Sequence, residues 1–132
     1  EDRLGNYGWN LGMAFQLIDD MLDFTASEDT LGKPVGSDLR EGKVTLPVIL
    51  TLRHCLPEER HLIETVMSEG AFDTVPLSAI LALLNKYTAL EKVKQRAMKY
   101  TETAMEQLLM LPESPYKRAL YAVTELVVDR KN

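Results

Sequence analysis

Residues 3–24 of the chain are RLGNYGWNLGMAFQLIDDMLDF, and this stretch decides the fold. Its apolar residues recur every three or four positions, which is the spacing of an α-helix and not the alternation of a strand. Because they surround the helix almost completely, we expect residues 3–24 to form one helix that is mostly buried. Three glycines, Gly5, Gly8 and Gly12, would let another helix pack closely against it.

The rest of the chain also has the pattern of helices. A second helix should begin after Thr45, with Pro47 in its first turn. Further helices are expected over residues 58–68, 77–87, 89–110 and from residue 115 onward, with Thr88 and Glu91 as a capping box and Ser114 as an N-cap. We therefore predict an all-α fold of about six helices. The length is sufficient for one helical unit, residues 1–132, with its own core.

The composition excludes several classes of protein. The chain has 132 residues, of which 45% are hydrophobic and 27% charged, and its net charge is -5. An acidic chain is a poor match for nucleic acid, which needs a basic face. No apolar run approaches the ~20 residues of a membrane span. The single cysteine, Cys55, cannot form an internal disulfide and suits a reducing compartment, so we expect a cytoplasmic protein.

Negative charge is concentrated at the front of the chain. Residues 1–42 contain nine acidic and three basic residues, whereas residues 43–132 contain eleven acidic and twelve basic residues. Six of the seven glycines also lie in the first part. We infer that the distinctive chemistry lies there.

A polar stripe lies on the otherwise apolar first helix, formed by Gln16, Asp19, Asp20 and Asp23. These positions share one helix face. Three carboxylates within about 6 Å repel one another, so the stripe must face either water or a cation. Carboxylates without a neighbouring His or Cys suit Mg²⁺. An isolated acidic stripe is more often a solvated surface, but the apolar residues on the same turns indicate that these acids line a cavity between helices.

A glycine-rich loop, residues 25–42, follows the stripe directly. Loops of this length inside a compact domain are usually functional or disordered. Lys33 and Lys43 suit phosphate oxygens, and the glycines let backbone N–H groups approach an anion. Alone, this would be an ordinary flexible surface loop. Next to the carboxylates it predicts a clamp for a Mg²⁺-bound diphosphate, and we expect it to be mobile until that ligand binds.

The chain resembles the trans-isoprenyl diphosphate synthases, the polyprenyl synthetase family, in the second aspartate-rich motif and the loop that follows it. The residues that carry the resemblance are FQLIDDMLD at 15–23, GK at 32–33, GSDL at 36–39, GK at 42–43 and TLP at 45–47. The match is unbroken over about residues 7–50. Beyond it, a weaker resemblance points to the C-terminal region of the long-chain polyprenyl branch.

The resemblance implies the isoprenoid synthase fold and a prenyltransferase with Mg²⁺ as its cofactor. Its substrates would be an allylic prenyl diphosphate and isopentenyl diphosphate, and the full-length protein would be a homodimer. Carried over by position, the metal-binding residues would be Asp19, Asp20 and Asp23. The residues that bind the allylic diphosphate would be Gln16, Lys33, Lys43 and Asp38. Asp19 and Lys33 would be the catalytic residues.

The departure from the family concerns length. Its members are more than twice as long, and this chain lacks their first aspartate-rich motif. We therefore expect a C-terminal fragment that holds half of a bipartite site, folds, and is inactive alone. Two alternatives remain open. One is a non-catalytic module that binds Mg²⁺-diphosphate or associates with another subunit. The other is a terpene cyclase, which the Gly-Lys loop disfavours.

Overall fold

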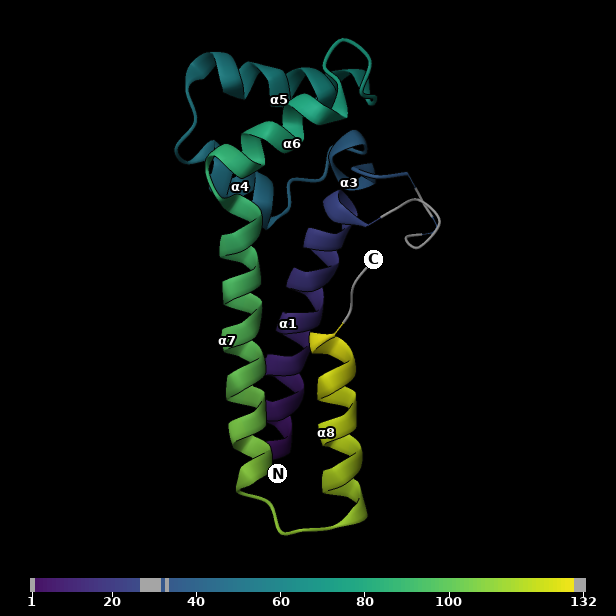
Figure 1. Ribbon diagram of the computed structural model, residues 1–132, viewed down its shortest axis with the longest axis vertical. Coiled ribbons are helices and arrows are strands. Elements are labelled where there is room, and N and C mark those ends of the chain that lie inside the picture. Colours follow the sequence, from purple (N-terminus) through teal and green to yellow (C-terminus); the bar gives the residue numbers. More distant parts are fainter. Residues whose placement is uncertain (1, 27–31, 33, 130–132) are drawn as a thin grey trace. The chain divides into compact units, whose positions relative to one another are not determined.

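The computed structural model describes residues 2–26, 32 and 34–129, and these residues form helices and no strand (Figure 1). The helices are α1 (Asp2–Thr25), α3 (Ser37–Arg40), α4 (Leu46–Leu52), α5 (Pro57–Glu69), α6 (Leu77–Lys86), α7 (Ala89–Leu109) and α8 (Pro115–Val128). The predicted all-α fold is confirmed.

Most helix boundaries follow the signals in the sequence. Pro57 is the first residue of α5, and Gly70 ends that helix in the left-handed conformation, with φ of 66°. Ser114 is the N-cap of α8, and its hydroxyl accepts the N–H of Lys117 at 3.1 Å. Proline in the first turn and glycine after the last turn therefore act as their backbone preferences predict.

Two predicted caps differ from the structure. Thr45 lies at the N-cap position of α4, but its side chain makes no capping hydrogen bond. Thr88 precedes α7 with a φ of 52°, and its hydroxyl donates to the carbonyl of Tyr87 at 2.7 Å. The predicted capping box between Thr88 and Glu91, both of which are described residues, is therefore wrong. A hydroxyl can bond its local backbone instead of the helix, and here it does.

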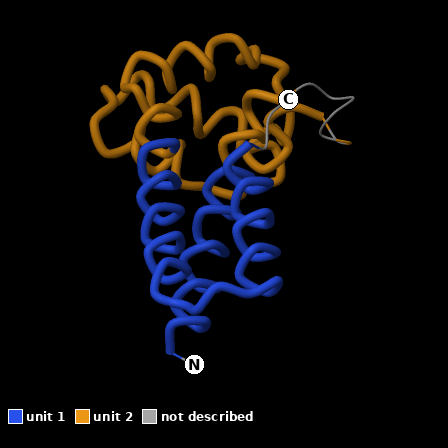
Figure 2. Tube along the Cα trace, turned by 60° about the horizontal axis from the view of Figure 1, so that its bottom comes forward, with its two compact units in different colours: residues 1–19, 94–131 blue, residues 20–93, 132 orange. Residues whose placement is uncertain are grey.

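The chain divides into two compact units, which Figure 2 shows in different colours. Unit 1 comprises residues 1–19 and 94–131, and unit 2 comprises residues 20–93 and 132. The single helical unit over residues 1–132 stays a prediction.

Unit 1 is held together around a tyrosine. The first part of α1, the second part of α7 and α8 run side by side in both views (Figures 1 and 2). Tyr7 is buried between them, and its hydroxyl donates to the carbonyl of Leu120 at 2.8 Å and lies 2.9 Å from the hydroxyl of Thr124. Apolar neighbours complete this core: Leu11, Ala104, Met105, Leu108, Leu111, Leu120 and Tyr121. Tyr7 therefore ties α1 to α8.

One face of α1 is open among the described residues, where the sequence predicts a mostly buried helix if neighbouring helices from a longer chain are present and an exposed face if they are not. Gly5, Gly8 and Gly12 are exposed, and a Cβ atom added to any of them would meet nothing within 4 Å. No helix of the described residues therefore packs against this face. Three large apolar side chains of α1 are also exposed: Leu4, Trp9 and Phe15.

Unit 2 is organised around the antiparallel helices α5 and α6. Their buried residues alternate with exposed ones at helical spacing and include Ile63, Val66, Ile80 and Leu84. Val48 of α4 is also fully buried. These aliphatic side chains form the apolar interior of the unit, which the 3.6-residue period predicts.

A small polar network joins the beginning of α5 to the end of α6. Lys86 Nζ lies 2.5 Å from Glu59 Oε2, and the Tyr87 hydroxyl donates to Glu59 Oε1. The same Oε1 accepts the N–H of Leu56 at 2.9 Å. The hydrogen bond from Lys86, followed by those from Tyr87 and Leu56, lowers the pKa of Glu59 to about 2. The hydrogen bond to Glu59 raises the pKa of Lys86 and that of Tyr87.

Replacing Tyr7 by Phe keeps the ring and removes the hydroxyl that bonds α8. We expect the free energy of unfolding to fall by about 1–2 kcal/mol, since the hydrogen bonds of the Tyr7 hydroxyl with Leu120 and Thr124 are lost. Urea denaturation followed by circular dichroism measures the change. Tyr116→Phe is the matched control, because Tyr116 is 83% exposed and its loss of a hydroxyl should be neutral. Equal losses in both variants would contradict a role for the Tyr7 hydroxyl.

The Glu59 network predicts how stability depends on pH. Because the folded pKa of about 2 lies below the ordinary value of 4.5, ionised Glu59 stabilises the fold. This contribution is complete above about pH 4.5 and is lost as the pH falls towards about 2. Glu59→Gln should lower stability at neutral pH and flatten the decline across that acid range. Urea unfolding at a series of pH values tests this, with exposed Glu58→Gln as the control that should keep the decline.

Candidate functional site

The predicted polar stripe lies on α1, and its residues differ in burial. Gln16 is exposed and Asp19 is partly buried, whereas Asp20 and Asp23 are only 9% and 1% exposed. Buried charge is costly unless it is paired or hydrogen-bonded, so a solvated surface stripe would not bury two carboxylates. The burial of Asp20 and Asp23 therefore favours an interacting site over the solvated alternative.

Asp23 joins the end of α1 to the following loop, within unit 2. Its main-chain carbonyl accepts the N–H of Gly36 at 2.7 Å. Its side-chain Oδ2 accepts the N–H of Asp38 at 3.2 Å. The last carbonyls of a helix have no partner inside the helix, and here the loop supplies one. The loop is therefore attached to α1 at the residue that ends the acidic motif.

The described part of the loop contains a single helical turn, α3, where the sequence predicted irregular structure. Gly36 precedes the turn with φ of 74°. The hydroxyl of Ser37 donates to Glu41 Oε2 at 3.1 Å, and Gly42, with φ of 84°, donates its N–H to the carbonyl of Leu39 at 3.0 Å. Of the predicted mobile segment, residues 25–42, residues 27–31 and 33 lie outside the described residues, and its mobility stays a prediction.

Lys43 follows this turn and is held through its backbone. Its N–H donates to the carbonyl of Asp38 at 2.8 Å. Its side chain is exposed, and Nζ lies 3.4 Å from Glu41 Oε1. An exposed ion pair of this kind contributes little, so the ammonium can exchange Glu41 for another anion. Lys33, the other predicted phosphate-binding lysine and a predicted catalytic residue, lies outside the described residues.

The donor set suits a hard cation. Asp19 and Asp20 offer carboxylate oxygens, which Mg²⁺ prefers, and the third carboxylate of the motif, Asp23, is buried and already accepts the N–H of Asp38. Within residues 2–26, 32 and 34–129, no three His, Cys, Asp or Glu side chains converge as a ready metal site. Mg²⁺ does not require such a site, because it usually takes one or two carboxylates and completes its octahedron with water and phosphate oxygens. The residues therefore fit Mg²⁺ that arrives with a diphosphate.

Phe72, between α5 and α6, contacts the loop without any local signal in the sequence. A Cβ atom on Gly36 would lie 2.7 Å from two atoms of the Phe72 ring. The ring therefore packs on the main chain of Gly36. A glycine in the sequence can indicate that another residue packs closely on its backbone, but it does not identify that residue.

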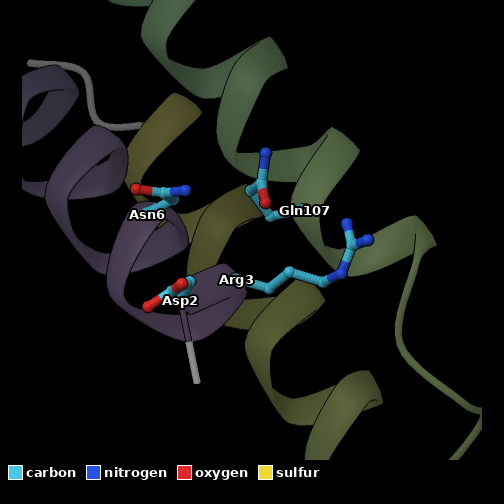
Figure 3. A pocket seen from close by; sticks show the side chains of 4 residues that line it. All are labelled: Asp2, Arg3, Asn6 and Gln107. Atoms are coloured by element: carbon cyan, nitrogen blue, oxygen red, sulfur yellow. The ribbon is translucent and has the colours of Figure 1, made fainter.

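An open depression of about 520 Å³ lies elsewhere, at the first turns of α1 (Figure 3). It is lined by Asp2, Arg3, Asn6 and Gln107. Asn6 precedes Asp19 by thirteen residues, or about 20 Å along the helix, so the depression is separate from the acidic stripe. None of its four lining residues is buried, and it has no feature of a ligand site.

Comparison with known proteins identifies the family. Residues 1–84 match the family model for polyprenyl synthetase. The chain belongs to the polyprenyl synthetase family. None of the helices formed by the described residues is long and apolar enough to span a membrane.

Two relatives within the polyprenyl synthetase family match nearly the whole chain. An all-trans-nonaprenyl-diphosphate synthase (geranyl-diphosphate specific) of Rhodobacter capsulatus is 42% identical over 129 residues, which cover 98% of this chain and 39% of that protein. The octaprenyl diphosphate synthase of Escherichia coli (strain K12) is 40% identical over 130 residues, with 98% and 40% coverage. The chain thus spans about two fifths of these relatives.

Solved structures of polyprenyl synthetases share the fold. A polyprenyl synthase from Caulobacter crescentus CB15, complexed with calcium and isoprenyl diphosphate, has a TM-score of 0.85 and 34% identity, covering 99% of this chain and 40% of that one. A geranylgeranyl pyrophosphate synthase from Corynebacterium glutamicum, complexed with isoprenyl diphosphate and magnesium, has a TM-score of 0.87 and 30% identity, with 98% and 37% coverage. The predicted isoprenoid synthase helical fold is confirmed.

Proposed function

We propose that this chain is the C-terminal part of a polyprenyl diphosphate synthase and that it binds the Mg²⁺-complexed allylic diphosphate. The synthase would elongate this substrate with isopentenyl diphosphate. One observation carries the proposal: buried Asp23 attaches the Gly- and Lys-containing loop to the carboxylate-bearing end of α1 through two hydrogen bonds. Relatives named nonaprenyl and octaprenyl synthases support a long-chain product. Two similar structures that hold isoprenyl diphosphate with calcium or magnesium support the ligand.

The metal would be held by carboxylates of α1. Bound Mg²⁺ would neutralise negative charge on the diphosphate and stabilise the departing pyrophosphate. We propose that Asp19 and Asp20 hold it, directly or through water. Asp23 would support them from its buried position by holding the loop.

The diphosphate would be bound by the loop and the exposed part of the stripe. Lys43 would exchange its exposed contact with Glu41 for a phosphate oxygen, and Lys33 would bind the diphosphate and assist its departure. Gln16 would donate its amide N–H to a phosphate oxygen. The N–H of Asp38 donates to Asp23 and its carbonyl accepts the N–H groups of Glu41 and Lys43, and Asp38 would take part in the same site.

Turnover would require more than this chain. A diphosphate carries about three negative charges at neutral pH, and its departure needs stabilisation from more than one side. The chain spans about two fifths of its relatives, so we propose that the remaining part of the fold supplies the second set of ligands. The isolated chain would bind the ligand without turnover. The homodimer and the cytoplasmic location stay predictions.

A second candidate is a non-catalytic module that associates with another subunit. It is favoured by one relative, the heptaprenyl diphosphate synthase component 2 of Bacillus subtilis (strain 168), which is 35% identical over 125 residues. Its name indicates an enzyme of more than one component. The intact carboxylates of α1 favour the catalytic proposal over this alternative.

Binding of magnesium pyrophosphate to the isolated chain tests the proposal directly. We expect a dissociation constant in the millimolar range, or about -4 kcal/mol, because one wall of the site is present. Phosphorus NMR of pyrophosphate titrated with the chain measures it, with and without Mg²⁺. Asp19→Asn should weaken binding at least ~10-fold, since a charged ligand is lost. Asp73→Asn, in an exposed acid of unit 2, is the control and should bind like the wild type.

In a full-length synthase that contains this chain, Asp19→Ala should lower steady-state turnover at least ~100-fold at saturating Mg²⁺. The physical reason is the loss of a group that stabilises the leaving charge. Prenyl transfer from an allylic diphosphate to labelled isopentenyl diphosphate measures the rate, and Asp73→Asn is again the control. A near-normal rate for Asp19→Ala would contradict a metal-binding role for Asp19 and would favour the alternative that it is a solvated surface residue.

A further inference from the structure

We propose that Asp23, Gly36 and Phe72 form a latch that positions the diphosphate-binding loop, and that Asp23 is a positioning residue and not a metal ligand. Phe72, which belongs to the connection between α5 and α6, would thereby help to position the loop. The inference rests on the proposed function and adds to it the means by which the loop is held.

Asp23 forms hydrogen bonds with two residues of the loop. Its carbonyl accepts the N–H of Gly36 at 2.7 Å, and its Oδ2 accepts the N–H of Asp38 at 3.2 Å. The residue is 1% exposed. Mg²⁺ gives up its waters reluctantly and usually keeps several of them. A carboxylate that is buried and already bonded to the backbone is therefore better suited to fixing the loop than to receiving a hydrated ion.

Gly36 forms the middle of the latch. Its φ of 74° lies in the left-handed region that glycine adopts without strain. A Cβ atom at this position would lie 2.7 Å from the Phe72 ring, well inside the ordinary carbon contact of about 3.5–4.0 Å. The ring thus lies against Gly36 at the side where a Cβ atom would stand.

The latch also positions the backbone of Lys43. The Asp38 N–H bonds Asp23, and the Asp38 carbonyl accepts the N–H of Lys43 at 2.8 Å. Hydrogen bonds within α3 and from Gly42 to Leu39 complete this segment. Release of Gly36 or Asp38 would therefore displace the backbone from which Lys43 reaches a phosphate. Phe72 would affect ligand binding through Gly36 and Asp38, without touching the ligand.

Amide hydrogen exchange of the 132-residue chain, followed by NMR, provides the first test. Asp23→Ala removes the acceptor for Asp38, and Phe72→Ala removes the cover on Gly36. Each should speed exchange of the Asp38 amide at least ~10-fold, as expected when a hydrogen bond is lost. Asp23→Asn keeps a neutral oxygen acceptor and should stay within about 3-fold of the wild type. Phe72→Leu, which keeps most of the bulk, should restore much of the protection.

A variant in the core of unit 2 distinguishes a general loss of stability from a specific effect of Phe72 on the loop. Ile80→Val shortens a fully buried side chain in α6 and lowers the stability of unit 2 while Phe72, Gly36 and Asp23 stay unchanged. This variant should speed amide exchange in α5 and α6. The exchange rate of the Asp38 amide should not rise more than the rates in those helices. Phe72→Ala should show the opposite selectivity.

The second readout is the dissociation constant for magnesium pyrophosphate, measured by phosphorus NMR. Phe72→Ala and Asp23→Ala should each weaken binding ~5–10-fold, whereas Asp23→Asn should bind nearly as well as the wild type. A metal ligand behaves differently, because loss of its charge alone weakens binding. Asp19→Asn provides that reference in the same assay.

Two results would overturn the latch. The first is Asp38 exchange in Phe72→Ala that matches the wild type. The second is loss of binding in Asp23→Asn as large as that in Asp19→Asn, which would make Asp23 a metal ligand. Failure of the wild-type chain to bind magnesium pyrophosphate would instead overturn the proposed function. The exchange data would then decide the latch on their own.

Discussion

A buried carboxylate at the end of a helix needs hydrogen-bond donors, and in this chain the backbone of the next loop supplies one. Asp23 is almost inaccessible to solvent, and it accepts one N–H through its carbonyl and another through its side chain. Burial makes these bonds stronger and their loss more costly than at the surface. These bonds attach the loop to the end of α1, and Asp38 in turn accepts the backbone N–H of Lys43.

The rest of unit 2 supports that attachment. Helices α5 and α6 are antiparallel, and their apolar faces form the interior of the unit. Glu59 bonds Lys86 and Tyr87 where α5 begins and α6 ends, and Phe72 lies in the connection at the opposite end of the pair. The polar network and the aliphatic core therefore hold the connection that places Phe72 on Gly36. A side chain with no chemistry of its own thus packs on the loop that we propose binds the diphosphate.

Much of this molecule could be predicted from its sequence, because the deciding signals are local. Apolar periodicity and the proline, serine and glycine at helix ends predicted α1, α5 and α6 nearly to the residue, and the first residue of α8. The spacing of Asp19, Asp20 and Asp23 placed them on one helix face. The contact of Phe72 with Gly36 could not be predicted, since it joins residues far apart in the chain and leaves no periodic trace. Thr88 also differed, because its hydroxyl bonds the preceding carbonyl where a capping box was expected.

The central claim is that the carboxylates of α1 and the loop after it bind one metal-complexed diphosphate together. Paramagnetic Mn²⁺, which accepts the same oxygen ligands as Mg²⁺, tests it most directly by broadening nearby amide signals in an NMR spectrum of the chain. With manganese pyrophosphate, we expect selective broadening at Asp19, Asp20 and Lys43, and no such pattern in Asp19→Asn. Broadening spread over other surface acids, or centred on the depression at Asp2 and Asn6, would contradict the account.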